Sequence, residues 1–179
     1  MAFHHIALAT RDLAATHRFY TEVMGFKVVK VVVAPTPEES GWAKHVFYDT
    51  GNGEMIAFWD IHDGEIEAGP WTGDLSSVIG LPQWVNHVAF DAPTLDALET
   101  RKQHWLEHGL TVAEIDHGFC TSIYATDPNE ILVEFCCTTR PFSDEELAAA
   151  SRLVDDANPE LETLPGMRVL KPIEAPVSR

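Results

Sequence analysis

The sequence predicts an α+β fold made of two βαβββ modules, and two matched stretches are the first observations behind this prediction. HIALATRDL, starting at His5, aligns without gaps on HVAFDAPTL, starting at His87, and YDTGNGEMIAFW, starting at Tyr48, aligns on YATDPNEILVEF, starting at Tyr124. The matches occur in the same order, which indicates an internal duplication. The third observation is that one helical pattern and three strand-like runs follow each initial strand signal.

The same sequence signals predict the helix and the strands of both modules. Apolar residues recur near the helical spacing after the first strand, and a glycine, Gly25 or Gly109, stands where each helix would end. The turns GNGE and DPNE precede the last strands. The first module's predicted strands are residues 4–9, 26–33, 45–50 and 54–59, with helical positions Leu13, Phe19, Tyr20 and Val23. The second module's are residues 85–90, 110–115, 119–125 and 131–137, with helical positions Leu95, Leu98, Trp105 and Leu106.

The modules are expected to form one domain that is followed by a C-terminal extension. In the extension, Ser143 and Glu146 form a capping-box pattern, which predicts the start of a helix. The tail from Asn158 is rich in proline and is expected to run extended over the surface. The predicted boundaries are 1–137 for the domain, with module one at 1–60, a linker at 61–83 and module two at 84–137, and 138–179 for the helix and tail.

Composition restricts the partners of the chain. A net charge of −16 with only 12 Lys and Arg residues argues against nucleic acid and anionic membranes, both of which need clustered cations. No apolar run approaches the roughly 20 residues that span a bilayer, and the start lacks a signal-peptide pattern, so a cytoplasmic location is expected. Cys120, Cys136 and Cys137 are an odd set that favours buried, reduced thiols over a disulfide framework.

Three polar residues in the predicted strands suggest a metal site. His5 and His87 occupy equivalent positions of the repeat, and Glu134 lies between apolar Val133 and Phe135. Two imidazoles and one carboxylate on different strands match the facial triad that binds a divalent transition metal and leaves positions open. The alternative is that the histidines are ordinary core or surface residues and that Glu134 lies on the solvated face of an antiparallel sheet.

The motifs HHIALATRDLAATHRFYTEVMGF, NHVAF and SIYATDPNEILVEF resemble those of the vicinal oxygen chelate superfamily, and the resemblance covers roughly residues 3–137. This superfamily includes glyoxalases, extradiol dioxygenases, fosfomycin-resistance transferases and drug-sequestering proteins. The resemblance implies that the two modules form an incomplete barrel, with His5, His87 and Glu134 at the positions of the metal ligands. One departure is Glu130 in DPNE, where the family usually has glycine.

The resemblance also implies a reaction class. Glyoxalases use a fourth ligand on the last strand of the first module, and the offset of the repeat assigns that position to Phe58, which cannot bind metal. Three-ligand relatives include Fe(II) extradiol dioxygenases, which cleave catecholic rings. In that comparison Tyr124 and His117 take the catalytic proton-transfer roles. Fe(II) is the favoured metal, with Mn(II), Zn(II) or Ni(II) as alternatives.

Other readings stay open at this point. The chain could instead be a non-catalytic module that sequesters a planar small molecule, a glyoxalase-like lyase or isomerase, or a thiol transferase. Aromatic residues could line a flat pocket or pack in the core, and His45 could face the pocket or solvent. A homodimer is compatible with the resemblance, with the site built within one chain or across two. The aromatic candidates are Trp42, Phe58, Trp59, Trp71 and Trp84.

Overall fold

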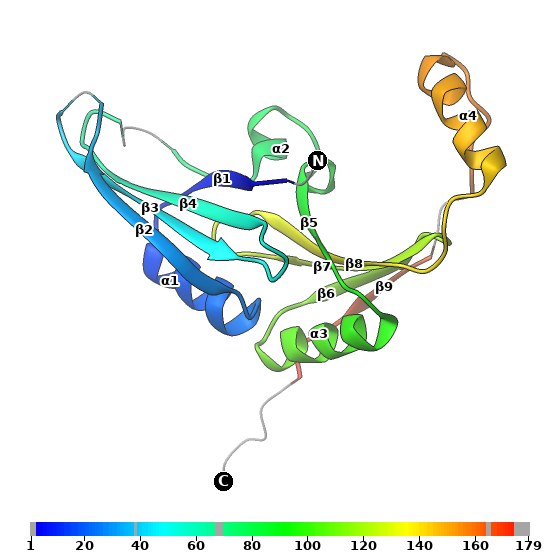
Figure 1. Cartoon of the computed structure of the whole chain (residues 1–179), viewed down its shortest axis with the longest axis horizontal. Coiled ribbons are helices and arrows are strands. Elements are labelled where there is room, and N and C mark those ends of the chain that lie inside the picture. Colours follow the sequence, from blue (N-terminus) through cyan, green and yellow to red (C-terminus); the bar gives the residue numbers. More distant parts are fainter. Residues whose placement is uncertain (1–2, 38, 67–69, 164–165, 174–179) are drawn as a thin grey trace, which may run out of the picture. The chain divides into compact units, whose positions relative to one another are not determined.

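The fold is described from a computed structural model of the chain, for residues 3–37, 39–66, 70–163 and 166–173 (Figure 1). The chain divides into two compact units that interleave along the sequence. The first unit contains residues 1–88 and 126–133, and the second contains residues 89–125 and 134–179.

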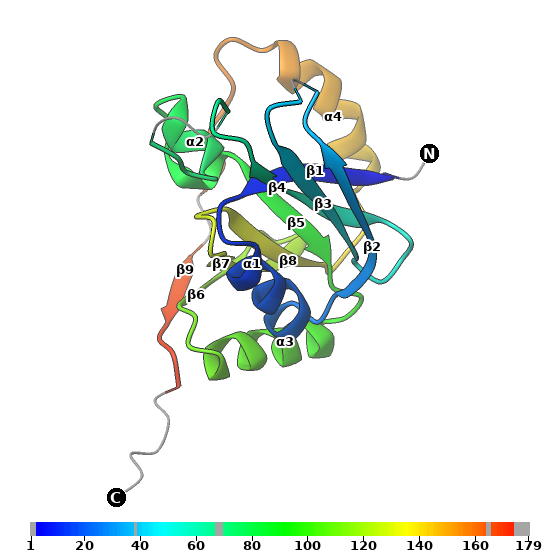
Figure 2. The same cartoon turned by 90° about the vertical axis from the view of Figure 1, so that its left-hand side faces the viewer.

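The first unit contains a four-stranded mixed sheet with the order β1-β4-β3-β2 (Figure 2). β1 pairs in parallel with β4, and the other pairs are antiparallel. A short helix, α1, continues into a π-helical turn, and this segment packs its aromatic side chains on one face of the sheet. The bounds are β1 His5–Thr10, α1 Leu13–Arg18, the π-helical turn Phe19–Val23, β2 Lys27–Pro35, β3 Trp42–Asp49 and β4 Met55–His62.

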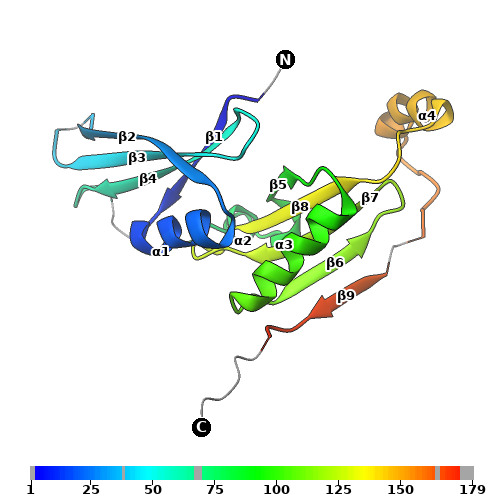
Figure 3. The same cartoon turned by 60° about the horizontal axis from the view of Figure 1, so that its bottom comes forward.

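The second sheet has five strands in the order β5-β8-β7-β6-β9, and α3 lies along one face of it (Figure 3). Trp105 of α3 is fully buried and its ring lies 5.4 Å from that of Phe135. The bounds are β5 His87–Asp91, α3 Leu95–Glu107, β6 Val112–Asp116, β7 Cys120–Thr126, β8 Leu132–Thr138 and β9 Met167–Leu170.

The α+β fold class and the repeated βαβββ order are confirmed, and neither sheet closes into a barrel. The glycines that end the two helices have the left-handed backbone that the sequence predicts, with φ of 75° at Gly25 and 82° at Gly109. The predicted linker is more ordered than its composition suggests. It contains a four-residue helix, α2 Leu75–Val78, whose first turn is capped by Asp74, and a 3₁₀ turn, Gln83–Val85.

The C-terminal extension differs from the prediction in one respect. The capping box of Ser143 and Glu146 does begin a helix, α4 Asp144–Asp155. The tail, however, is not simply extended over the surface, because Met167–Leu170 form β9 and pair antiparallel with β6. The sequence did not predict this strand for two reasons. Its surroundings are rich in proline, and its four residues are too few to show an alternating pattern. Within the described residues, no helix is long and apolar enough to cross a membrane.

The DPNE turn belongs to the first unit although its sequence lies in the second repeat. Asn129 is only 2% exposed and donates to Thr16 Oγ1 of α1 at 3.0 Å. Tyr20 Oη donates to Asp127 Oδ2 at 3.1 Å, and the Gly73 amide donates to Asn129 O at 2.9 Å. The turn therefore fixes α1 and the segment before α2 in one buried hydrogen-bond network.

Candidate functional site

His5 begins β1, and its imidazole lies on the sheet face opposite α1. The ring centroid is 5.4 Å from that of Phe47 and 6.1 Å from that of His45, both on β3. His4 Nδ1 lies 2.7 Å from His5 Nδ1, so one of these nitrogens donates and the other accepts. This contact fixes the orientation of the His5 ring. Ala7 follows on the same face, and its small side chain leaves room beside the imidazole.

His45, for which the sequence leaves a pocket-facing and a solvent-facing orientation open, is buried in the structure. Its side chain stacks on Trp59 with ring centroids 3.9 Å apart, and the residue is only 9% exposed. Buried Nε2 has no hydrogen-bond partner among the described residues. Burial, followed by the nearby His5, lowers the pKa of His45, which therefore favours the neutral imidazole. The signal that could have found it is cross-strand register, because His45 lies opposite Trp59.

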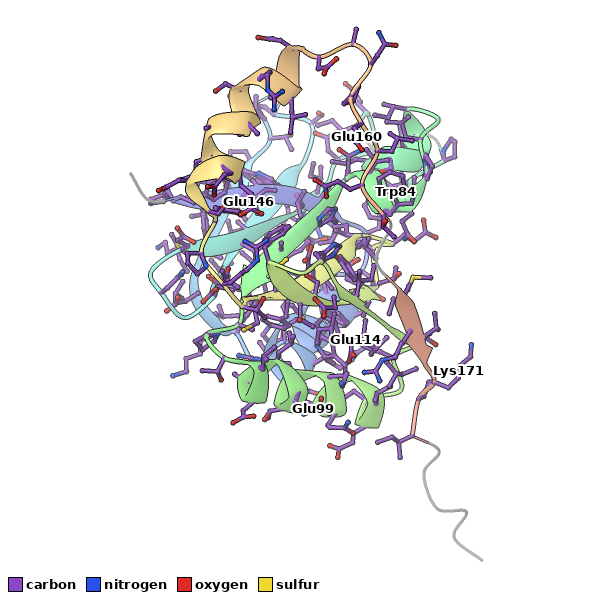
Figure 4. All side chains as sticks on the ribbon, turned by 90° about the vertical axis from the view of Figure 1, so that its right-hand side faces the viewer. Trp84, Glu99, Glu114, Glu146, Glu160 and Lys171 are labelled. Carbon is purple, nitrogen blue, oxygen red and sulfur yellow. The ribbon has the colours of Figure 1, made fainter. Side chains whose placement is uncertain are left out.

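His87, at the start of β5, is exposed. Its Nδ1 lies 3.1 Å from the backbone oxygen of Trp84, so Nδ1 carries the proton that this oxygen accepts. In the tautomer with the proton on Nδ1, Nε2 is the acceptor nitrogen of the ring. This is the usual arrangement of a metal-binding histidine, in which the second nitrogen is oriented by a carbonyl or carboxylate. Trp84 itself is 68% exposed, and its side chain is labelled in Figure 4.

Glu134 lies in the middle of β8 and is 5% exposed. Its neighbours Val133 and Phe135 are buried, and Phe135 points toward α3. Strand alternation therefore directs Glu134 to the opposite face of the sheet. The residue is a buried carboxylate on the face away from the helix, which excludes the reading of a solvated surface glutamate.

Tyr124, the predicted catalytic tyrosine, contacts both of its predicted neighbours in the site. Its Oη lies 3.2 Å from His117 Nε2, in the loop between β6 and β7. Burial first, and then the hydrogen-bonded carboxylate of Glu134, raise the pKa of Tyr124 to about 12. The phenol is therefore protonated at neutral pH. Glu134, Tyr124 and His117 form one polar row in the second unit.

The assignment of Phe58 as the fourth-ligand position is wrong. Phe58 is fully buried on the helix side of the first sheet, with its ring 4.7 Å from that of Tyr20. Its neighbour Ala57 lies on the other face, paired with Ala7. The offset of 76 that aligned Phe58 with Glu134 therefore fails by one residue within the last strand.

Register in the second sheet gives the correct equivalence. The Ala92 amide donates to Cys136 O at 2.8 Å, the pattern expected where Ala92 pairs with Cys137 in a parallel ladder. Ala89 then lies opposite Glu134, as Ala7 lies opposite Ala57. The counterpart of Glu134 in the first module is thus Ala57, which has no side-chain donor. The position of the fourth ligand therefore still supplies no ligand, but the residue that occupies it is Ala57 and not Phe58.

The predicted ligands are divided between the units, with His5 and His87 in the first and Glu134 in the second. Over the described part of the chain, no group of three or more His, Cys, Asp or Glu side chains is placed to hold one metal ion. The triad therefore stays a prediction. Its donor types still fit a divalent metal, because the His87 tautomer presents Nε2 and Glu134 is a buried carboxylate.

The cysteines are free thiols, as expected, and Cys120 and Cys137 do not have the environment of a nucleophile. Cys120 and Cys137 are buried, and Cys136 is partly buried. Burial, followed by its hydrogen bond with Cys136, raises the pKa of Cys120 to about 12. A thiol with that pKa is almost wholly protonated at neutral pH and is a poor nucleophile.

Several solved structures share this fold. The glyoxylase/bleomycin resistance protein/dioxygenase domain from Frankia sp. EAN1pec is 19% identical, with a TM-score of 0.61 over 77% of this chain and 98% of that chain. The fosfomycin resistance protein from Listeria monocytogenes is 18% identical, with a TM-score of 0.51 over 78% of this chain and 94% of that chain. Lactoylglutathione lyase from Agrobacterium tumefaciens is 20% identical, with a TM-score of 0.50 over 76% and 92%.

At these identities the structural likeness shows the fold alone. A search of curated proteins finds no match. The sequence profile of the Glyoxalase/Bleomycin resistance protein/Dioxygenase superfamily, however, matches residues 2–135, which is most of the chain. The chain therefore belongs to the Glyoxalase/Bleomycin resistance protein/Dioxygenase superfamily.

Proposed function

We propose that the chain is a metal-dependent dioxygenase that cleaves the ring of a catecholic substrate, with Fe(II) held by His5, His87 and Glu134. The observation that carries this proposal is the contact of Tyr124 with both His117 and the Glu134 carboxylate. A phenol joined to an imidazole and to a predicted ligand is suited to proton transfer beside a metal. Bound Fe(II) would supply open coordination positions for a diol and O₂.

The residues of the chain would divide the proton transfers. The pKa of His45 is lowered, which favours the neutral imidazole, and this residue would serve as the base for a diol hydroxyl. Tyr124, with a pKa of about 12, is a hydrogen-bond donor and is available to stabilise negative charge on a substrate oxygen. His117 would orient the phenol through its contact with Oη. His45 thus joins the predicted catalytic pair of Tyr124 and His117.

The alternatives receive less support. A glyoxalase-type isomerisation uses a fourth ligand, and Ala57 supplies none at the equivalent strand position. A thiol transferase that used a protein thiolate would need a lowered cysteine pKa, whereas the pKa of Cys120 is raised to about 12. A sequestering module needs neither the buried Glu134 nor the Tyr124–His117 contact.

The first prediction tests the ligand set together with the reaction. Protein reconstituted anaerobically with Fe(II) should consume O₂ with a catechol and form a yellow ring-opened product, but should not turn over methylglyoxal with glutathione. His5→Ala, His87→Ala and Glu134→Ala should each lose at least 10-fold in metal affinity, because each removes one of three ligands. His108→Ala is the matched control, since that histidine is exposed at the end of α3.

Metal content, O₂ uptake and circular dichroism are measured on the same preparations. Three ligand variants that stay folded and keep stoichiometric Fe(II) would overturn the ligand assignment. An Fe(II)-loaded protein that binds catechols without consuming O₂ would support sequestration instead.

The second prediction separates the proton-transfer residues. Tyr124→Phe and His45→Gln should each lower kcat by about 10²-fold, the usual contribution of a positioned acid or base. His117→Gln should have a smaller effect, because it acts through the phenol. Rates near that of the parent for Tyr124→Phe, with unchanged metal content, would show that the tyrosine only packs.

A further inference from the structure

Helix α4 carries an apolar stripe that its own chain leaves exposed. Leu147, Ala150 and Val154 share one face at helical spacing, and the first and last of them are 60% and 84% exposed. No residue of α4 is buried against the rest of the described chain. A single helix of this length is marginal in water, because most helical stability in proteins comes from packing of an apolar face. The stripe therefore needs a partner surface.

An apolar groove in the first unit has the shape of such a surface. It lies between α1 and the strands β2 and β3, and β2 is the edge strand of its sheet (Figure 3). Its walls include Leu13, Ala14, Val28, Val31 and Val46. The groove has a volume of about 390 Å³. Since an apolar cavity of about 150 Å³ is large enough for benzene, this groove has room for two branched side chains.

The two surfaces carry opposite charge. Residues 13–35, which contain α1 and β2, have three cations and one acid in a chain of net charge −16. The cations are Arg18, Lys27 and Lys30, and all three are exposed. Residues 144–156, which contain α4, have five carboxylates and one arginine. Complementary charges of this kind favour the correct pairing of two surfaces.

Charge also separates the groove from another exposed apolar segment of the first unit. Residues 75–85 expose several large apolar side chains, but this segment contains no charged residue. It therefore has no electrostatic preference for an acidic helix. The groove beside α1 and β2 combines apolar walls with nearby cations, which are the two properties that α4 requires.

A second copy of the chain supplies both surfaces at once. Helix α4 belongs to the second unit and the groove to the first, so each chain has one helix to offer and one groove to fill. Two copies related by a two-fold axis would make the same contact twice, and this closes a dimer. Leu147 and Val154 lie two helical turns apart, about 10 Å along the axis, and would be the two anchors of each contact.

We propose that α4 of one copy docks into the groove between α1 and β2 of a second copy, and that the reciprocal contact closes a homodimer. Leu147 and Val154 enter the groove beside Val28 and Val31. The carboxylates of α4 face the cations of α1 and β2. This interface is independent of the metal and of the reaction, so it can be tested on protein without metal.

The first test measures the oligomeric state of the full chain by sedimentation velocity over a dilution series. The parent should be a dimer when concentrated and should dissociate on dilution. Leu147→Asp on the helix and Val31→Asp in the groove should each raise the Kd of the dimer at least about 10-fold, because each places a carboxylate in an apolar contact. Ala148→Asp is the matched control, since this exposed residue lies on another face of α4, and it should leave the Kd unchanged.

The second test asks which chain provides the helix. A chain with Leu147→Cys is mixed with a chain with Val31→Cys and oxidised, and a disulfide between the two chains is detected by non-reducing electrophoresis and peptide mapping. The mixture should form this link, whereas a mixture of Ala148→Cys with Val31→Cys should form at least about 10-fold less, as expected for a helix face outside the contact.

A protein that stays monomeric throughout the dilution series would overturn the inference. So would a dimer whose Kd is the same in the parent, Leu147→Asp and Val31→Asp. A link that forms only when both cysteines are on one chain would show that α4 fills its own groove, and this result would also overturn docking onto a second copy. Circular dichroism of every variant confirms that the comparison is made between folded proteins.

Discussion

Glu130 and Gly73 show how single residues shape the turn that joins β7 and β8. Glu130 has a left-handed backbone, with φ of 69°, at the position where the family usually has glycine. Its carboxylate accepts from Thr72 Oγ1 at 2.5 Å, and its backbone oxygen accepts from Gln83 Nε2 at 3.0 Å. These contacts offset the cost of a side chain in this conformation, which is about 1–2 kcal/mol.

Gly73 is a second residue whose identity is fixed by contact. A Cβ added there would lie 2.3 Å from Asn129 O, far inside van der Waals contact. The Gly73 amide also donates to that oxygen, so the backbone cannot move away without breaking a buried network. Gly73→Ala should therefore lower the free energy of unfolding by about 1–3 kcal/mol. Gly64→Ala, which meets nothing within 4 Å, should change it by less than about 0.5 kcal/mol in urea denaturation. Equal stability of the two variants would contradict this packing argument.

At the scale of elements, we predict that the stability of the start of α4 depends on pH. Glu146 lies at the start of α4 (Figure 4). Bidentate hydrogen bonds from Arg140, followed by the Ser143 amide, lower the pKa of Glu146 to about 2. Because the folded pKa is below the ordinary value, this stabilisation is present above about pH 4.5 and is lost as the pH falls toward 2.

The protection factors of the α4 amides, taken relative to intrinsic amide exchange at each pH, should therefore fall as the pH is lowered across that range. Glu146→Gln should remove this dependence, whereas Glu145→Gln, in the same first turn, should retain it. Protection factors in the parent protein that do not change between pH 4.5 and 2 would contradict the role of the carboxylate.

Strand β9 gives the next prediction. It covers the edge of β6, where Glu114 contacts both Lys102 and Arg168. A chain that ends at Ala157 would lose this ladder and expose the β6 edge, so its free energy of unfolding should fall by roughly 2–4 kcal/mol, at about 1 kcal/mol for each hydrogen bond. Arg168→Ala, which leaves the ladder intact, should cost less than about 1 kcal/mol. Unchanged thermal stability of the shortened chain would show that β9 contributes nothing.

The element order could be predicted from sequence because alternation and helical spacing are local signals. The sheet face on which a side chain lies and the register between strands are harder to predict from the sequence. The shift of one residue that separates Phe58 from Ala57 reverses which side chain faces the site, and the matching letters of the repeat hid this shift. β9 escaped prediction because four residues acquire strand structure only from their partner strand. Whether His45 faces the pocket or solvent could not be decided from the sequence, because its burial depends on Trp59, which lies on another strand.

At the scale of the whole molecule, the sequence repeat and the compact units do not coincide. The first unit takes residues 126–133 from the second repeat, and this segment supplies partners to groups buried in the first. The duplication is visible in the sequence. The transfer of residues 126–133 from the second repeat to the first unit is not. It depends on contacts such as that between Thr16 and Asn129, which are 113 residues apart.

This interleaving predicts that the first repeat is not stable alone. A fragment of residues 1–86 would leave the fully buried Tyr20 hydroxyl without Asp127, and both Thr16 and the Gly73 amide without Asn129. Each unsatisfied buried group costs about 1–3 kcal/mol, and a whole domain has only about 5–15 kcal/mol of stability. The fragment should therefore show no cooperative thermal transition by near-ultraviolet circular dichroism.

A matched pair of Tyr20→Phe variants tests the cause of this instability. In the full chain, the substitution removes a hydrogen bond with Asp127 and should lower stability by about 1 kcal/mol. In the fragment it removes a hydroxyl that has lost its partner, so it should raise the helical content measured by far-ultraviolet circular dichroism. The hydrogen-bond network therefore requires that Tyr20→Phe destabilises the full chain but increases the structure of the fragment. If fragment 1–86 melted as cooperatively as the full chain, or if Tyr20→Phe weakened both equally, the first repeat would be folding without the turn at residues 126–133.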